Sequence, residues 1–135
     1  MNDPRPVQGI VLAHGAMAEG LVDAVRRISG LADGVLVPVS NTGKSPDALQ
    51  EEISGLLEPG PTLIFTDLPS GSCAVTAHIC CREDGEEAVI SGVNLPILLD
   101  FVFNRDLPLE ELVPRLIGKG RGSINGVPDF PIPGS

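Results

Sequence analysis

Short apolar runs alternate along this chain with longer stretches in which apolar residues recur every three or four positions. Runs of this kind are typical of buried strands, and the longer stretches are typical of helices with one buried face. We expect strands at residues 7–13, 35–39, 62–66 and 88–91. Four strand–helix units predict an α/β fold, a three-layer α/β/α sandwich around a mainly parallel four-stranded sheet.

The expected helices are bounded by their end signals. The first carries Leu21, Val25 and Ile28 as its apolar stripe and stops at Gly30, and the second begins after Ser45 as its N-cap. Further helices are expected at residues 73–82, as a buried helix, at 96–103, and around 109–117, where Pro114 should kink the helix or limit its start. A polar turn is expected at 82–85. The Gly/Pro-rich chain beyond Gly118 predicts at most a short edge strand and a loose tail.

Length and charge restrict the function further. The chain has 135 residues, so we expect one domain over residues 1–125 and a flexible Pro/Gly-rich tail over 126–135. The net charge of −9 argues against nucleic acids and anionic membranes, which both need a basic face. No apolar run reaches the roughly 18–20 residues that a membrane-spanning helix needs, so we expect no membrane insertion. Three clustered cysteines without zinc-type spacing indicate reduced, packed thiols in a cytoplasmic protein.

Polar residues and glycines follow every predicted strand. In parallel sheets, ligands bind beyond the carboxyl ends of the strands, at the point where the strand order reverses. The residues at these ends are His14 and Gly15, residues 41–44, Asp67 with residues 69–72, and residues 92–94. We therefore expect a site for a small anionic group at this edge of the sheet.

His14 and Asp67 are the candidate catalytic pair. If the first and third strands are neighbours, as in sheets of order 2-1-3-4, the two side chains face each other. A carboxylate bonded to one ring nitrogen of a histidine fixes the tautomer and leaves the other nitrogen nucleophilic. This combination suggests a phosphoryl group that is carried on His14 itself while Asp67 orients and stabilises the ring.

The loop before the third helix is the candidate phosphoryl-binding segment. Gly71 lets backbone N–H groups approach an anion, and the helix that follows presents its positive end there. Ser70, Ser72 and Gly15 are expected to take part in the same binding. His78 is more simply a structural residue and Lys44 a solvated surface group. The string at residues 43–45 is not a P-loop, because position 38 is proline where that motif needs glycine.

Three segments resemble the IIA domain of the mannose family of the bacterial phosphoenolpyruvate-dependent sugar phosphotransferase system (PTS). They are IVLAHG at residues 10–15, FTDLPSGS at 65–72 and ISGVNLPILLD at 90–100, with a looser match of GKGRGSI at 118–124. The resemblance implies a parallel sheet of order 2-1-3-4 with a fifth strand that pairs across a homodimer. It also implies phosphorylation of His14 by the phosphocarrier HPr, transfer to a IIB protein, support of His14 by Asp67, and Ser72 beside the phosphoryl group, with no cofactor or metal. Leu68 and Asn94 are further candidates for lining the site.

Two departures from the family pattern concern Leu68 and Pro69. The family often carries a threonine or similar polar residue, and then an aromatic residue, directly after the aspartate, so phosphoryl contacts or partner preference can differ here. Many relatives also continue into a IIB domain, whereas this chain ends shortly after Val127. We therefore expect a separate IIB protein as the acceptor, in sugar uptake or in regulation.

Three alternatives stay open at this point. One is the related phosphotransfer subunit of dihydroxyacetone kinases, which shares the fold and the early histidine. A second is a receiver-like domain phosphorylated on Asp67, although Ala13 and His14 stand where receivers carry an acidic pair for Mg²⁺. The third is a non-catalytic binding module.

Overall fold

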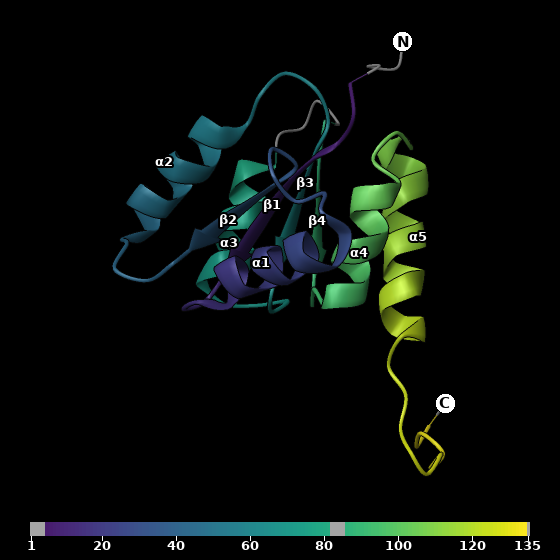
Figure 1. The fold of residues 1–135 in the computed structure, drawn as a ribbon. Coiled ribbons are helices and arrows are strands. Elements are labelled where there is room, and N and C mark those ends of the chain that lie inside the picture. Colours follow the sequence, from purple (N-terminus) through teal and green to yellow (C-terminus); the bar gives the residue numbers. More distant parts are fainter. Residues whose placement is uncertain (1–4, 82–85, 135) are drawn as a thin grey trace.

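The computed structural model describes residues 5–81 and 86–134. In this part of the chain, four parallel strands form one sheet in the order β2-β1-β3-β4 (Figure 1). The strands are β1 (Gln8–Ala13), β2 (Leu36–Ser40), β3 (Thr62–Thr66) and β4 (Glu87–Ser91). The predicted α/β fold and sheet order are thereby confirmed, and the polar turn expected at 82–85 lies outside the described residues.

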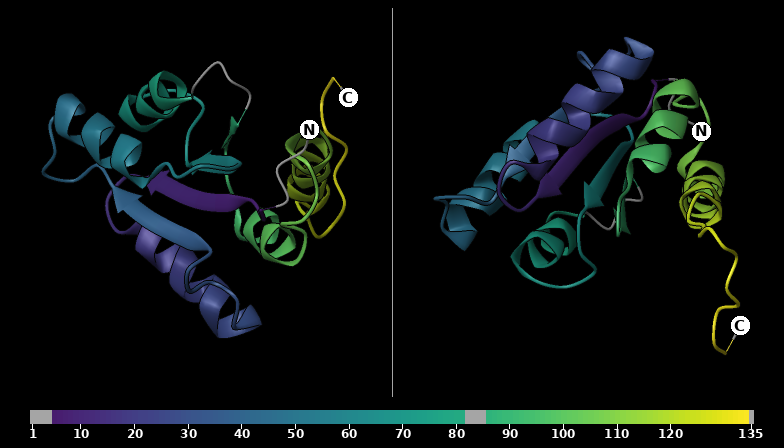
Figure 2. Two further views of the ribbon diagram at one scale, coloured as in Figure 1. Left: turned by 90° about the horizontal axis from the view of Figure 1, so that it is seen from above. Right: turned by 60° about the horizontal axis from the view of Figure 1, so that its bottom comes forward.

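Among the described residues, five helices flank the sheet in two layers. They are α1 (Met17–Ser29), α2 (Pro46–Leu56), α3 (Ser72–Cys80), α4 (Leu95–Phe103) and α5 (Leu109–Gly122). Figure 2 shows α2 and α3 together on one face of the sheet, α1 and α4 on the other, and α5 outside α4, beside β4. Each face therefore has a core of its own, as right-handed crossovers around a reversing strand order require.

Side-chain alternation along β1 supplies both cores. Ile10 and Leu12 pack with α2 and α3, whereas Val11 and Ala13 pack with α1 and α4. Because successive side chains of a strand point to opposite faces, a strand covered on both faces is apolar at nearly every position. This is why the apolar runs of the sequence locate the strands to within one or two residues.

The buried faces of two helices differ from the expected ones. In α1 the buried residues are Ala18, Val22 and Val25, while Ile28 is 62 % exposed because, at 3.6 residues per turn, it points to one side of the stripe that these three residues form. The third helix ends at Cys80 and is not buried all round, since Val75 and Ile79 are more than half exposed. Composition alone does not distinguish an exposed apolar side chain from a buried one.

The carboxyl-terminal helix is longer than expected. It begins at Leu109, ahead of Pro114, and continues through Gly122, so the stretch expected to be at most an edge strand is helical up to that residue. Gly120 lets α5 pack closely on α4, because a Cβ at this position would lie only 2.5 Å from Ile97 Cδ1 of α4. Close packing of α5 on α4 thus overrides the weak helix propensity of glycine. Residues 124–134 are exposed and contain no helix or strand.

Gly9 of β1 provides a test of the packing between sheet and helices. A Cβ there would lie 2.6 Å from Leu36 Cδ2 and 2.7 Å from Phe101 Cε2, and Phe101 is fully buried with its ring edge-on to Phe65. We expect Gly9→Ala to lower the free energy of unfolding by about 1–3 kcal/mol, the usual cost of overpacking a core. Urea denaturation followed by circular dichroism measures the change.

Gly20→Ala is the matched control for this substitution. Gly20 lies inside α1, and apart from its chain neighbours and the backbone of its own helix no atom lies within 4 Å of the position that its Cβ would take. The same added methyl group should therefore stabilise the protein, by about 0.5–1 kcal/mol, because alanine restricts the unfolded chain more than glycine does. Equal effects of the two substitutions would show that Gly9 is not tightly enclosed.

Candidate active site

The strand order reverses at the carboxyl ends of β1 and β3. The chain passes from β1 to β2 on one side of the sheet and then enters β3 on the other side of β1. The pairing of Leu12 with Thr66 places the residues that follow these strands next to each other. His14 comes directly after β1 and Asp67 directly after β3, so both lie where ligands bind in open parallel sheets.

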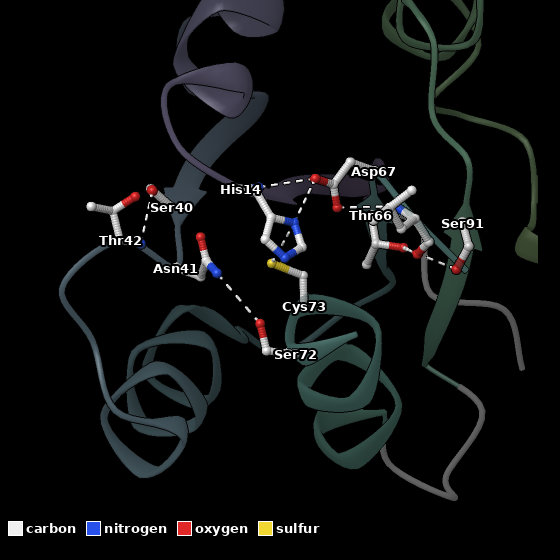
Figure 3. Close-up of polar contacts among 10 residues, drawn as sticks. His14, Ser40, Asn41, Thr42, Thr66, Asp67, Ser72, Cys73 and Ser91 are labelled. Atoms are coloured by element: carbon white, nitrogen blue, oxygen red, sulfur yellow. Dashed lines mark hydrogen bonds and ion pairs between the residues drawn. The ribbon is translucent and has the colours of Figure 1, made fainter. Parts of the chain in front are cut away.

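The side chains of His14 and Asp67 form a direct pair (Figure 3). His14 Nδ1 lies 2.8 Å from Asp67 Oδ2, and the backbone N–H of His14 donates to the same oxygen at 3.0 Å. The carboxylate side chain is only 8 % exposed, whereas the imidazole is 42 % exposed. The pair is therefore anchored at the aspartate and open to solvent at the ring.

Three donated hydrogen bonds keep Asp67 ionised. Burial raises the pKa of this carboxyl, but the His14 backbone N–H, the His14 ring and the Leu68 backbone N–H outweigh burial, and the net pKa lies below the usual value. An ionised carboxylate accepts hydrogen bonds and donates none. Nδ1 of His14 therefore carries the proton in the neutral ring, and Nε2 carries the free lone pair.

The segment after β3 holds Asp67 in place through its backbone. Leu68 donates its N–H to Asp67 Oδ1 at 3.0 Å, and its carbonyl accepts a hydrogen bond from the Thr66 hydroxyl at 2.9 Å. The same Thr66 hydroxyl shares a 2.9 Å hydrogen bond with the Ser91 hydroxyl of β4. No local sequence pattern distinguishes Thr66 or Ser91, because a threonine or serine inside a strand carries no functional signal until its neighbour is known. The Leu68 side chain itself is 52 % exposed beside the site.

The loop before α3 passes close to the imidazole. Gly71 has φ of +95° and ψ of −175°, a conformation essentially restricted to glycine, and His14 Cε1 lies 4.0 Å from the position of an added Cβ. Among the described residues, no side chain caps the start of α3, whose first N–H groups are left without partners inside the helix. Ser70 and Ser72 are exposed beside it, and Gly15, with φ of +60°, turns the chain directly after His14.

The turn after β2 reaches the same loop. Asn41 donates a long hydrogen bond of 3.4 Å from Nδ2 to Ser72 Oγ, so its amide lies at the rim of the site. Asn41 lay in a turn that the sequence marked as polar, but nothing in the sequence singled out its side chain. Lys44 forms an ion pair with Glu52, which agrees with the surface role expected for it.

Cys73 lies in the apolar core directly beside the imidazole of His14. Cys73 is fully buried, and its Sγ lies 3.8 Å from His14 Nδ1. Burial and the charge of Asp67 raise the pKa of this thiol, as expected for a packed cysteine.

Asn94 caps α4 by accepting from the Ile97 N–H at 3.1 Å and donates to the Gly120 carbonyl at 3.3 Å. The structure thus gives Asn94 a role in joining α4 to α5, and a role in lining the site stays a prediction.

A family model matches the part of the chain that carries the site residues from His14 to Asn94. Residues 9–115 match the model described as EIIA-man, PTS system fructose IIA component. The chain belongs to the EIIA-man family. It is thus a IIA-type component of the sugar phosphotransferase system, as the sequence resemblance predicted. No curated protein matches the chain.

Solved structures of EIIA-man relatives share this fold. The phosphotransferase system component EIIA of Streptococcus agalactiae superimposes with a TM-score of 0.83 at 22 % identity, over 90 % of this chain and 97 % of that chain. The mannose/sorbose specific IIA subunit of Enterococcus faecalis gives 0.81 at 23 % identity, over 95 % and 98 %. The IIA protein associated with the fucose utilization operon of Streptococcus pneumoniae gives 0.75 at 20 % identity, over 94 % and 96 %. Within residues 5–81 and 86–134, no helix is long and apolar enough to cross a membrane.

Proposed function

We propose that this EIIA-man protein is a phosphoryl carrier that accepts a phosphoryl group from HPr on His14 Nε2 and passes it to a IIB protein. The observation that carries the proposal is the 2.8 Å contact between His14 Nδ1 and Asp67 Oδ2 on an otherwise accessible ring. The bond to Asp67 fixes the proton on Nδ1, so the nucleophilic nitrogen is the one that an incoming phosphoryl group can reach.

The transfer step follows from this tautomer. The Nε2 lone pair attacks phosphorus, the new nitrogen–phosphorus bond forms, and the bond between phosphorus and the donor breaks, with its electron pair returning to the donor. The imidazole becomes positively charged while Nδ1 keeps its proton. Asp67, ionised and hydrogen-bonded to that proton, stabilises the charge, as the aspartate of a hydrolase triad does.

The start of α3 is the proposed binding place for the phosphoryl oxygens. The helix begins at Ser72, and its N-terminal N–H groups with the positive end of the helix dipole favour an anion. Gly71 brings this end beside His14, and the exposed Ser70 and Ser72 hydroxyls can donate to solvent-side oxygens, while Ser72 Oγ accepts from Asn41. Because the transfer uses the ring, the carboxylate and backbone N–H groups, it calls for no nucleotide or other cofactor.

We also propose a cytoplasmic location and a homodimer, because the family resemblance implies HPr as the donor and a strand that pairs across a homodimer. One feature supports the pairing: β4 is an edge strand on its outer side, next to a groove between β4 and the end of α5. Analytical ultracentrifugation measures the oligomeric state.

The experiment that tests the carrier function uses phosphoenolpyruvate, enzyme I and HPr. The protein should gain the mass of one phosphate, and the label should be lost in acid but survive base, as phosphohistidine does. A label that survives acid but is lost in base would instead indicate an acyl phosphate on Asp67. No label at all in the complete mixture would contradict the carrier function.

Two exposed apolar side chains flank the site and are expected to contact HPr. Met17 is 43 % exposed at the start of α1, and Leu68 is 52 % exposed directly after Asp67. We expect Leu68→Ser to raise the KM for phospho-HPr about 3- to 10-fold with little change in kcat, since it removes apolar contact area but keeps the backbone bonds to Asp67. Steady-state transfer rates at varied phospho-HPr measure both constants.

Ile28→Ser is the matched control for this docking prediction. Ile28 is 62 % exposed, but it lies in the last turn of α1, which runs away from the site toward the opposite end of the sheet. The substitution should leave KM unchanged. A drop in kcat rather than a rise in KM for Leu68→Ser would show that Leu68 acts on the chemistry and not on docking.

A further inference from the structure

Three different metal-ligand atoms meet at the candidate active site. An imidazole nitrogen of His14, a carboxylate oxygen of Asp67 and the thiol sulfur of Cys73 all lie within 4.8 Å of one another. Two of these approaches are closer, with Nδ1 at 2.8 Å from Oδ2 and 3.8 Å from Sγ. The three residues come from the end of β1, the end of β3 and the first turn of α3, so the fold itself brings them together.

The spacing of these atoms suits a small cation. Three points within 4.8 Å of one another have a common centre roughly 2.8 Å or less from each, and zinc bonds of about 2.0–2.3 Å need only a small inward shift. A turn of the half-exposed ring aims Nδ1 at that centre, and water can supply the fourth ligand from the solvent side.

The donor set selects among cations. One nitrogen, one sulfur and one oxygen ligand form the mixed set that zinc accepts, and a thiolate ligand favours zinc over the hard cations magnesium and calcium. The carboxylate and the thiol supply negative charge once the thiol proton has left. We propose that His14, Asp67 and Cys73 form a Zn²⁺ site whose occupation blocks phosphorylation of His14.

The block follows from the position of one proton. A metal on Nδ1 takes the lone pair there, so the single proton of the neutral ring must move to Nε2 through solvent, and the Cys73 thiol proton is released to water. Nε2 then has no lone pair for attack on phosphorus, and Asp67 no longer accepts from Nδ1. Zn²⁺ therefore opposes the transfer and has no part in it. The block rests on the proposed function, whereas the metal binding does not.

Cobalt spectroscopy tests the metal site independently of phosphoryl transfer. Co²⁺ is added to the purified full chain, and a thiolate-to-cobalt charge-transfer band in the near ultraviolet is expected, which added Zn²⁺ abolishes. Cys73→Ser should remove the band and weaken Zn²⁺ binding at least about 10- to 100-fold, since loss of even an outer partner of a metal ligand has an effect of that size. Cys80→Ser should retain the band. Cys80 lies in the same helix and the same core, but its sulfur contacts Gln50 and Ser54.

A second variant guards against misfolding. If Cys73→Ser is unfolded by circular dichroism, His14→Gln replaces it, because that side chain is 42 % exposed and its removal leaves the core intact. His14→Gln should likewise lose the cobalt band. A wild-type protein without the band, or a band that survives in the folded Cys73→Ser or His14→Gln variant, would overturn the site.

The block is measured in the phosphorylation assay. HPr is phosphorylated first and separated from enzyme I. Transfer of the phosphoryl group from phospho-HPr to this protein is then measured under three conditions: with Zn²⁺, with Mg²⁺ at the same concentration, and with Zn²⁺ followed by a chelator. We expect at least a tenfold slower transfer with Zn²⁺ alone and full recovery with the chelator. Unchanged transfer under saturating Zn²⁺ would overturn the block. A cobalt band in a protein that is never phosphorylated would contradict the carrier function and leave the metal site standing.

Discussion

His14→Gln is expected to abolish phosphate incorporation, with a loss of at least about 10⁴-fold in the rate of transfer from phospho-HPr. Glutamine has a similar reach but no nucleophilic nitrogen, and removal of a covalent nucleophile has effects of this size in other enzymes. The ring is 42 % exposed and lies outside both apolar cores, so the variant should fold normally. Intact-protein mass spectrometry after incubation with the phosphoenolpyruvate mixture measures the outcome.

His78→Gln is the matched control for this prediction. The chain has two histidines, and His78 lies on the exposed side of α3. Its replacement should leave incorporation at the wild-type level. An acid-labile label that persists in His14→Gln and disappears in His78→Gln would move the acceptor to the wrong end of α3 and contradict the site described above.

Asp67→Asn is expected to slow transfer by roughly 10²- to 10⁴-fold without unfolding the protein. An amide offers one acceptor oxygen where the carboxylate offers two, and its NH₂ group facing Nδ1 requires that Nδ1 be unprotonated. The ring proton then resides on Nε2, where it occupies the attacking lone pair. The loss should appear in kcat rather than in KM for phospho-HPr, because Asp67 is almost buried and makes its bonds to the ring and backbone.

Acid denaturation separates this positional role from a general loss of stability. The pKa of Asp67 is lowered from its ordinary 3.8 by folding, so its ionised form stabilises the fold above that pH, and this contribution is lost as the pH falls through the lowered value. Wild type should therefore be more stable than Asp67→Asn at neutral pH, and the difference should shrink below about pH 4. Asp129→Asn, in the exposed terminal segment, should change neither rate nor stability. A fully active Asp67→Asn protein would remove Asp67 from the mechanism.

The main residues of the site were predictable because they lie directly after predicted strands or directly before a predicted helix. His14 and Asp67 follow directly after apolar strands, and a parallel sheet collects such residues at one edge. Gly71 was predictable for a related reason, since a glycine before a helix that follows a strand indicates close approach of backbone to a ligand. Local pattern and topology together thus placed three of the contributors within one short region.

The remaining contributors depend on neighbours that are far away in the sequence. Thr66 acts on Asp67 through the Leu68 carbonyl and is joined to Ser91 of the next strand, and Asn41 reaches Ser72 across 31 positions. The contact of Cys73 with His14 likewise spans 59 positions. No local pattern reports such pairs, because each side chain has an ordinary structural explanation in its own segment.

The amino-acid pattern alone was enough to locate the strands, the fold class and the edge of the sheet at which His14 and Asp67 meet. Burial on both faces makes each strand an apolar run, and the alternation of strands with helices makes the strands parallel. The tertiary structure decided which nitrogen of His14 is free, the extension of α5 through Gly122, and the meeting of His14, Asp67 and Cys73. These depend on distances of a few ångströms between segments that only packing brings together. Hydrogen bonds and steric contacts act over that range, so their outcome is set once the layers have closed on the sheet.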